Sequence, residues 1–188
     1  IAGRGLVLDA SQASSVSAVD ADISANEGAV SILVNNAGIT RDNLLMRMKE
    51  EEWQAVIDTN LSAVFLPCKT FMRGMLKARH GRIINISSVR GFQGRAGDAA
   101  YAPSKGAINQ LTRSLAIEWA PYGITVNAIA PTFILTNINR DILDDQETYK
   151  WVLKRIPKGR LGEVRDIIAP VLFLCSPGAE FVTGHILY

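Results

Sequence analysis

Tyr101 and Lys105 are the two side chains whose types and spacing point most directly to chemistry. They are four residues apart at the start of a predicted helix, so both lie on one face of it, one turn apart. A tyrosine with its ordinary pKa near 10 is a poor acid or base at neutral pH, and an adjacent ammonium group lowers that pKa because it favours the phenolate. The pair therefore predicts a tyrosine that exchanges a proton with a substrate. Taken alone, the spacing also fits a helix N-terminus with an exposed lysine.

Two further polar residues lie where they can join this pair. Ser88 ends a predicted buried strand thirteen residues before Tyr101, with a glycine-rich loop between them. A hydroxyl there can face the phenol and donate a hydrogen bond to a carbonyl oxygen. Asn60 lies in a predicted helix on an otherwise apolar stretch, and a buried amide needs a hydrogen-bond partner. That partner is either a bound water or another polar group of the core.

The elements that must position these residues alternate between short apolar runs and longer helical patterns. Strands are predicted at residues 5–9, 30–34, 82–88 and 124–130, and a further strand begins after residue 181. Helices are predicted at residues 16–26, 49–79, 101–120, 137–155 and 164–175, with a kink or a break at Pro67. Strands joined by single helices predict βαβ units and a parallel sheet that is covered on both faces.

Ligands of such sheets bind at the carboxyl ends of the strands. The residues that follow the predicted strands are Asp9, residues 35–38, Ser87, Ser88 and residues 131–136. Small residues at 37 and 38 let a flat ligand approach the backbone closely. The loop after Ser88 also carries Arg90, Gln93 and Arg95, which either line a substrate pocket or face solvent.

Composition narrows the class of protein. The chain has 188 residues, 48% of them hydrophobic, which predicts one domain with its own core and excludes disorder. The net charge is only +2 and no run of Lys or Arg occurs, so we expect no nucleic-acid partner. No apolar stretch reaches membrane-spanning length, so we expect no membrane partner either. Cys68 and Cys175 lack metal-ligand spacing, which predicts no metal site and a reducing, cytoplasmic location.

Five motifs, in their order and spacing, resemble the short-chain dehydrogenase/reductase family. They are Asn36-Ala37-Gly38, Asn60, Ile86-Ser87-Ser88, Tyr101-x-x-x-Lys105 and Asn127-x-x-x-Pro131. The resemblance runs over essentially the whole chain. It implies an α/β fold, a Rossmann-type doubly wound parallel sheet, with residues 1–188 forming one NAD(P)-binding domain that contains the catalytic site. The implied reaction interconverts a ketone and a secondary alcohol with NADP or NAD, NADPH being slightly preferred.

The resemblance also implies a role for each matching residue. Tyr101 would be the general acid or base, Lys105 would hold the ribose hydroxyls and lower the pKa of Tyr101, Ser88 would bind the substrate oxygen, and Asn60 would hold a water of a proton relay. The implied cofactor contacts are Asp9 and Ala10 beside the adenine, Asn36, Ala37 and Gly38 beside the adenosine ribose, Pro131, Thr132, Ile134 and Thr136 beside the nicotinamide, and Tyr101 and Lys105.

The sequence departs from the family pattern in two respects. No glycine-rich phosphate-binding loop precedes Gly5, and the family's final strand and Gly-Gly turn do not follow Leu187. We therefore expect a Rossmann domain that is incomplete at both ends, which leaves open an inactive fragment or a structural subunit. In addition, Thr132 follows Pro131 where the family usually has glycine.

Different segments of the chain resemble members of the family that act on different substrates. Residues 36–48 resemble the 3-oxoacyl-acyl-carrier-protein reductases, in which a basic residue at the position of Arg79 helps to dock the carrier protein. A second basic position of that group is Tyr122 here. Residues 104–123 and 151–162 resemble gluconate and polyol dehydrogenases. A 3-oxoacyl thioester is thus the predicted substrate, with acyl carrier protein as a candidate partner; a sugar acid, polyol or small ketone is the alternative. In the relatives, the helices at 49–79 and 101–120 form a tetramer's dimer interface, so we expect a homo-oligomer.

Overall fold

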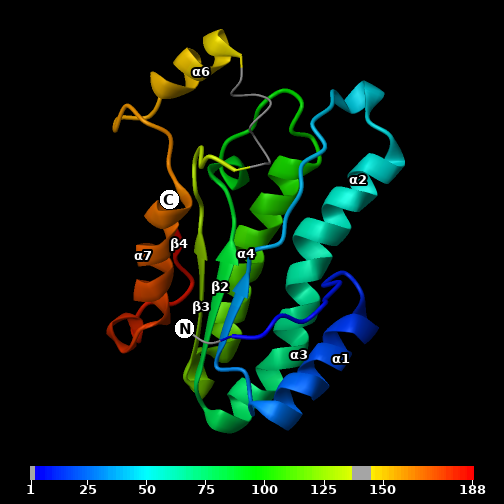
Figure 1. Cartoon of the computed structure of the whole chain (residues 1–188), viewed down its shortest axis with the longest axis vertical. Coiled ribbons are helices and arrows are strands. Elements are labelled where there is room, and N and C mark those ends of the chain that lie inside the picture. The colour runs from blue at the N-terminus through cyan, green and yellow to red at the C-terminus, as the bar shows by residue number, and fades with distance from the viewer. Residues whose placement is uncertain (1–2, 137–144) are drawn as a thin grey trace.

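Four parallel strands in the order β1-β2-β3-β4 form the centre of the structure, a computed structural model that describes residues 3–136 and 145–188 (Figure 1). They are β1 (Ile32–Asn35), β2 (Gly81–Ile86), β3 (Ile124–Ile129) and β4 (Ile186–Leu187). Residues 83 and 126 are register partners, as are residues 129 and 187. The predicted parallel α/β sheet is confirmed.

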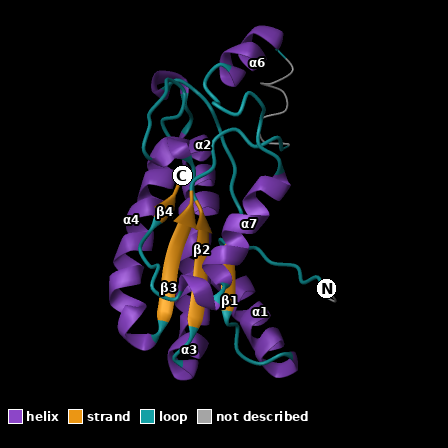
Figure 2. Cartoon of the chain, turned by 90° about the vertical axis from the view of Figure 1, so that its left-hand side faces the viewer, coloured by secondary structure: helices purple, strands orange, loops and turns teal. Residues whose placement is uncertain are grey.

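Helices cover both faces of this sheet, as the doubly wound prediction requires. Ile83 packs with helices α3 (Ala63–Ala78) and α4 (Tyr101–Trp119) in one buried cluster. Its neighbour Ile84 packs with Leu174 of α7 (Val164–Cys175) in a second cluster. Because successive side chains of a strand point to opposite faces, these two isoleucines place α3 and α4 on one face and α7 on the other (Figure 2).

The remaining helices lie around this three-layer core. Helix α1 (Ala13–Asn26) packs against α3, and α2 (Glu50–Ile57) packs against α4. Helix α6 (Gln146–Leu153) lies beyond the carboxyl end of the sheet (Figure 1). It occupies part of the predicted helix at 137–155, of which residues 137–144 lie outside the described part. Among the described residues, no helix has both the length and the apolar character needed to cross a membrane.

The long helix predicted at residues 49–79 is interrupted, but not at Pro67. Pro67 lies buried inside α3, and the interruption is the π-helical segment η2 (Asp58–Ser62) between α2 and α3. A π turn is wider than an α turn and is a common cause of helix deformation. This one contains the fully buried Asn60. The sequence pattern therefore predicts a break, but at a position five residues after the segment in which it occurs.

Residues 5–9 were predicted as a strand and are not one. Val7 is 98% exposed, and the described residues place no strand beside this segment. An isolated extended segment has no ladder of hydrogen bonds to hold it as a strand. The apolar run at 6–8 is therefore an exposed, extended connection before α1.

Candidate active site

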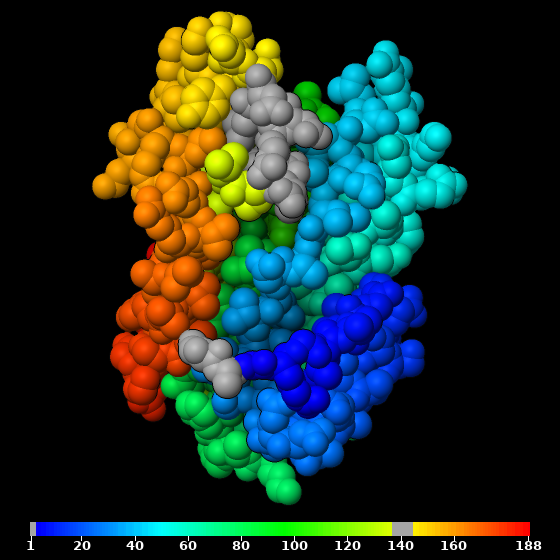
Figure 3. Space-filling view, viewed as in Figure 1, coloured from blue at the N-terminus to red at the C-terminus, as the bar shows by residue number. Residues whose placement is uncertain are grey.

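A cavity of about 560 Å³ lies at the carboxyl end of the sheet, between the segment that follows β1 and helix α7 (Figure 3). The residues that line it are Asn36, Ala37, Gly38, Ile86, Ser87, Ser88, Tyr101, Lys105, Pro131, Thr132, Ile134, Thr136, Val164 and Ile167. All of these except Val164 and Ile167 belong to a motif of the sequence or follow a predicted strand. The parallel sheet brings them together because its strands end on the same side.

Two predicted cofactor residues, Asp9 and Ala10, do not line this cavity. The Asp9 carboxylate instead accepts hydrogen bonds from the Ser11 amide and hydroxyl, at 3.0 and 2.6 Å, in the turn before α1. Their role beside an adenine stays a prediction.

Lys105 is the buried cation of the cavity. Only 4% of the Lys105 surface is exposed, and its Nζ donates a 2.8 Å hydrogen bond to the carbonyl oxygen of Ile86 at the end of β2. Burial disfavours the ammonium form and lowers the pKa of Lys105 to about 8. At neutral pH the group is therefore still mostly protonated, and it lies 5.7 Å from the centre of the Tyr101 ring.

The pKa of Tyr101 moves in the direction opposite to the one predicted. Burial raises it, a hydrogen bond from Ser88 opposes that rise, and the carboxylates of Asp98 and Asp42 add to it. The spacing of Tyr101 and Lys105 predicts a lower pKa because it reports only the ammonium group, whereas burial and the acidic neighbours depend on the folded chain. As a result, Tyr101 is a protonated phenol at neutral pH, which suits a proton donor rather than a base.

Ser88 lines the cavity beside Tyr101. Its Oγ accepts a 3.1 Å hydrogen bond from the backbone N–H of Arg90 in the 3₁₀ turn η3 (Val89–Gly91). Because that contact occupies a lone pair, the hydroxyl proton remains available for an oxygen acceptor. Tyr101, Ser88 and Lys105 together provide two O–H donors and one cation around a single cavity.

Asn60 lies under the cavity rather than on it. Its Oδ1 accepts from the Ile39 amide at 2.8 Å, and its Nδ2 donates to the Ile39 carbonyl and to Ser104 Oγ, each at 3.0 Å. The π turn directs this amide inward, where it ties the segment after β1 to helix α4. The Asn60 amide thus has protein groups as hydrogen-bond partners, which is one of the two alternatives that the sequence left open. The bound water of a proton relay stays a prediction.

Gly38 keeps the floor of the cavity open. A Cβ at this position would lie 3.5 Å from both Asn60 Oδ1 and Lys105 Nζ, so any larger side chain would fill the space above the lysine. The open backbone edge, the buried ammonium and the apolar wall from α7 fit the ribose and nicotinamide portion of a dinucleotide. The candidate residues for holding it are Lys105, Tyr101, residues 36–38 and residues 131–136.

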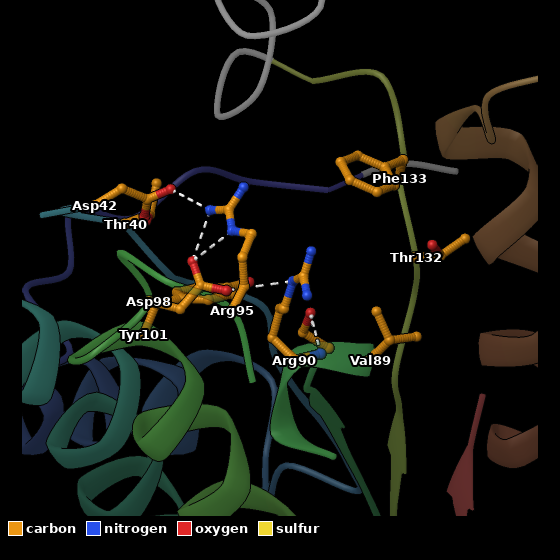
Figure 4. A pocket seen from close by; sticks show the side chains of 10 residues that line it. Thr40, Asp42, Val89, Arg90, Arg95, Asp98, Tyr101, Thr132 and Phe133 are labelled. Atoms are coloured by element: carbon orange, nitrogen blue, oxygen red, sulfur yellow. Dashed lines mark hydrogen bonds and ion pairs between the residues drawn. The ribbon is translucent and has the colours of Figure 1, made fainter. Parts of the chain in front are cut away.

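A smaller pocket of about 120 Å³ adjoins the cavity at Ser88, Tyr101 and Thr132 (Figure 4). It is also lined by Thr40, Asp42, Val89, Arg90, Arg95, Asp98 and Phe133. Two arginines of the loop after Ser88 thus line a pocket, whereas Gln93 is not among the lining residues. Asp42 and Asp98 were not predicted as site residues, and Phe133 belongs to residues 131–136, which the sequence places after a predicted strand. An acidic residue three positions before a helical tyrosine was the available signal for Asp98.

Comparison with known proteins agrees with this geometry. A family profile described as enoyl-(acyl carrier protein) reductase matches residues 2–188. The 3-oxoacyl-(acyl-carrier-protein) reductase FabG of Escherichia coli (strain K12) is 50% identical over 186 residues, which are 99% of this chain and 75% of that protein. FabG of Vibrio cholerae is 48% identical over the same length and shares.

Solved structures of other proteins share this fold, and their names differ from those of the FabG relatives. A gluconate 5-dehydrogenase from Burkholderia cenocepacia J2315, in complex with NADP and tartrate, has a TM-score of 0.94 at 39% identity and covers 96% of this chain and 71% of that one. ElxO with NADP bound has a TM-score of 0.89 at 32% identity. Sequence identity, fold and cavity agree: this chain belongs to the short-chain dehydrogenase/reductase family of NAD(P)-dependent oxidoreductases acting on CH–OH groups.

Proposed function

We propose that this protein reduces 3-oxoacyl thioesters to 3-hydroxyacyl thioesters with NADPH. The observation that carries the proposal is that Tyr101, Ser88 and Lys105 line one cavity in a chain half identical to FabG proteins. NADP in solved relatives supports the choice of cofactor.

The chain's own residues perform the proton chemistry in this proposal. When bound, NADPH supplies a hydride to the carbonyl carbon of the substrate. Ser88 donates a hydrogen bond to the carbonyl oxygen and orients it. Tyr101, kept protonated by its raised pKa, donates its phenolic proton to that oxygen as negative charge develops there. The ammonium of Lys105 then stabilises the phenolate that remains.

Three further features belong to the proposal. Arg79 follows α3, donates a 2.8 Å hydrogen bond to the Pro121 carbonyl and lies 6.0 Å from the ring of Tyr122. We propose it as a contact for the acidic acyl carrier protein. We also propose a homo-oligomer, either a dimer or a tetramer, and a cytoplasmic location that agrees with the unpaired cysteines Cys68 and Cys175.

A sugar-acid, polyol or small-ketone dehydrogenase is the second candidate. Two observations favour it: the gluconate dehydrogenase structures with TM-scores of 0.94, and Tyr122 at a position where the reductases carry a second basic residue.

The two candidates separate in one assay. Acetoacetyl-CoA and 5-ketogluconate are each tested as oxidants of NADPH, followed at 340 nm. We expect turnover of acetoacetyl-CoA, and activity on 5-ketogluconate alone would overturn the thioester proposal. Tyr101→Phe should lower kcat by about 10²- to 10⁴-fold because the proton donor is lost. A variant that retains wild-type kcat would contradict the role of Tyr101.

A further inference from the structure

The small pocket beside Ser88 and Tyr101 contains four charged side chains that the proposed reaction does not use. Asp98 is only 3% exposed at the start of helix α4. Arg95 donates to its Oδ1 from Nε and Nη2, at 3.2 and 2.6 Å, and reaches Asp42 Oδ2 at 2.6 Å. Two carboxylates thus occupy Arg95.

Arg90 is held differently. Its Nε lies 3.3 Å from Asp98 Oδ2, and the side chain is 18% exposed. That contact lacks hydrogen-bond geometry, since Asp98 Oδ2 has no hydrogen-bond donor among the described residues. Within residues 3–136 and 145–188, the terminal Nη atoms of Arg90 also have no hydrogen-bond acceptor. Figure 4 shows this guanidinium between Asp98 on one side and Phe133 and Thr132 on the other. Arg90 is therefore a partly buried cation beside the Ser88 hydroxyl, and the N–H groups of its Nη atoms are available to a ligand.

The charge balance of the pocket indicates what those donors bind. Arg90 and Arg95 contribute two positive charges, and Asp42 and Asp98 contribute two negative charges. A carboxylate placed here would add an uncompensated negative charge to a confined site, which is costly. A neutral carbonyl oxygen adds no charge, and it satisfies the guanidinium donors with a charge-assisted hydrogen bond.

We propose that Arg90 is a specificity-determining residue that donates a hydrogen bond to a second, uncharged carbonyl oxygen of the substrate, and that Asp98 is the positioning residue that orients it. A 3-oxoacyl thioester has such an oxygen two carbons from the reacting ketone. This inference rests on the proposed function, because it takes Ser88 and Tyr101 to hold the reacting carbonyl.

The test compares methyl ketones that differ in the group two carbons from the reacting ketone. Ethyl acetoacetate has a ketone and an ester carbonyl; 2-heptanone has the same number of chain atoms and only the ketone; acetoacetate replaces the ester by a carboxylate. Values of kcat and KM with NADPH are measured for each. The wild type should prefer the ester over 2-heptanone in kcat/KM for two reasons. The ester makes the ketone more electrophilic, and one charged hydrogen bond adds a further factor of about ten- to hundredfold.

Variants assign that preference to Arg90. In Arg90→Gln the ester-to-heptanone ratio should fall by about ten- to hundredfold, chiefly through KM for the ester, and Arg90→Lys should restore part of it. Arg113→Gln, at an exposed arginine of helix α4 that lines neither cavity, is the matched control and should retain the wild-type ratio. Asp98→Asn should lower the ratio in the wild type but not in Arg90→Gln, because a positioning residue acts through its partner. Melting temperatures identify any variant that fails to fold, and a lysine variant that folds without regaining preference would count against the proposal.

Three results would overturn the role of Arg90, the neutral acceptor or the proposed function. A wild type that reduces the ester and 2-heptanone equally well overturns the role of Arg90 and leaves ketone reduction intact. An Arg90-dependent preference for acetoacetate over the ester overturns the neutral acceptor in favour of a carboxylate. A wild type that reduces none of the three ketones, nor acetoacetyl-CoA, overturns the proposed function and this inference with it.

Discussion

At the scale of single residues, the cavity contains a charge that the fold tolerates at a cost. Burial lowers the pKa of Lys105 from 10.5 to about 8. Between these two values the unfolded chain binds a proton that the folded protein has released, so the free energy of unfolding rises with pH in this window. Below pH 8 both states bind the proton, and the folded state carries the whole cost of the buried ammonium. The ammonium lies beside Tyr101 and below the open backbone at Gly38, where the proposed reaction needs a cation. We interpret the cost in stability as a consequence of that function.

Lys105→Met is therefore expected to stabilise the protein while disabling it. At pH 7 the free energy of unfolding should increase by about 1–2 kcal/mol, since the burial cost exceeds the lost hydrogen bond to Ile86. The gain should shrink as the pH rises toward 10.5, because the wild-type lysine is then neutral when folded. Urea unfolding at pH 7, 8.5 and 10 measures it, and Lys77→Met, at an exposed lysine, is the control. A pH-independent loss of stability in Lys105→Met would contradict the argument.

At the scale of elements, the site depends on how closely the turn η3 approaches helix α4. Ser88 comes immediately before η3, and Tyr101 begins α4, so the packing of these two elements sets the distance between the two O–H donors. A Cβ at Gly91 would lie 2.6 Å from Asn109 Nδ2 and 2.8 Å from the carbonyl carbon and oxygen of Lys105. Backbone atoms of a helix cannot yield to such a contact, so the turn itself would have to move.

Gly91→Ala should consequently lower the free energy of unfolding by about 1–3 kcal/mol, the usual cost of overpacking. It should also lower kcat/KM about tenfold, because Ser88 moves with the turn. Gly94→Ala is the matched control: a Cβ at Gly94 meets no atom within 4 Å, so its stability should change by no more than about 0.5 kcal/mol. Thermal unfolding and NADPH oxidation measure both variants, and equal effects at the two glycines would refute the close-approach argument.

At the scale of the whole molecule, the outer surface of α3 and α4 carries apolar side chains. Phe65 is 47% exposed and Ile117 is 80% exposed. Both belong to the helices that cover one face of the sheet. Large exposed apolar side chains on neighbouring helices favour association with another copy of the chain.

The double substitution Phe65→Lys with Ile117→Lys should convert the proposed oligomer into monomers, because it places charges on the exposed apolar surface of α3 and α4. Light scattering after size-exclusion chromatography measures the mass. Met46→Lys, at a residue that is 87% exposed in the 3₁₀ turn η1 (Leu45–Arg47), should leave the mass unchanged. A wild type that is already monomeric would exclude the oligomer.

Features that depend on local spacing could be predicted from the amino-acid sequence alone. Residues four apart in a helix share a face whatever surrounds them, so Tyr101 and Lys105 were identified together. The strands at 30–34, 82–88 and 124–130 were predicted because buried parallel strands are apolar throughout, and the ligand residues followed because parallel strands end on one side. The structure moved the bounds of these strands by a few residues.

Features that depend on neighbours distant in the sequence could not be predicted and are seen only in the folded chain. The carboxylates around Arg95 come from positions 42 and 98, and no local pattern joins residues 53 positions apart. The direction of the pKa shift of Tyr101 depends on burial and on those same carboxylates. The interruption at residues 58–62 depends on where Asn60 finds Ile39 and Ser104. Residues 5–9 have the composition of a strand, yet a strand forms only where another lies beside it.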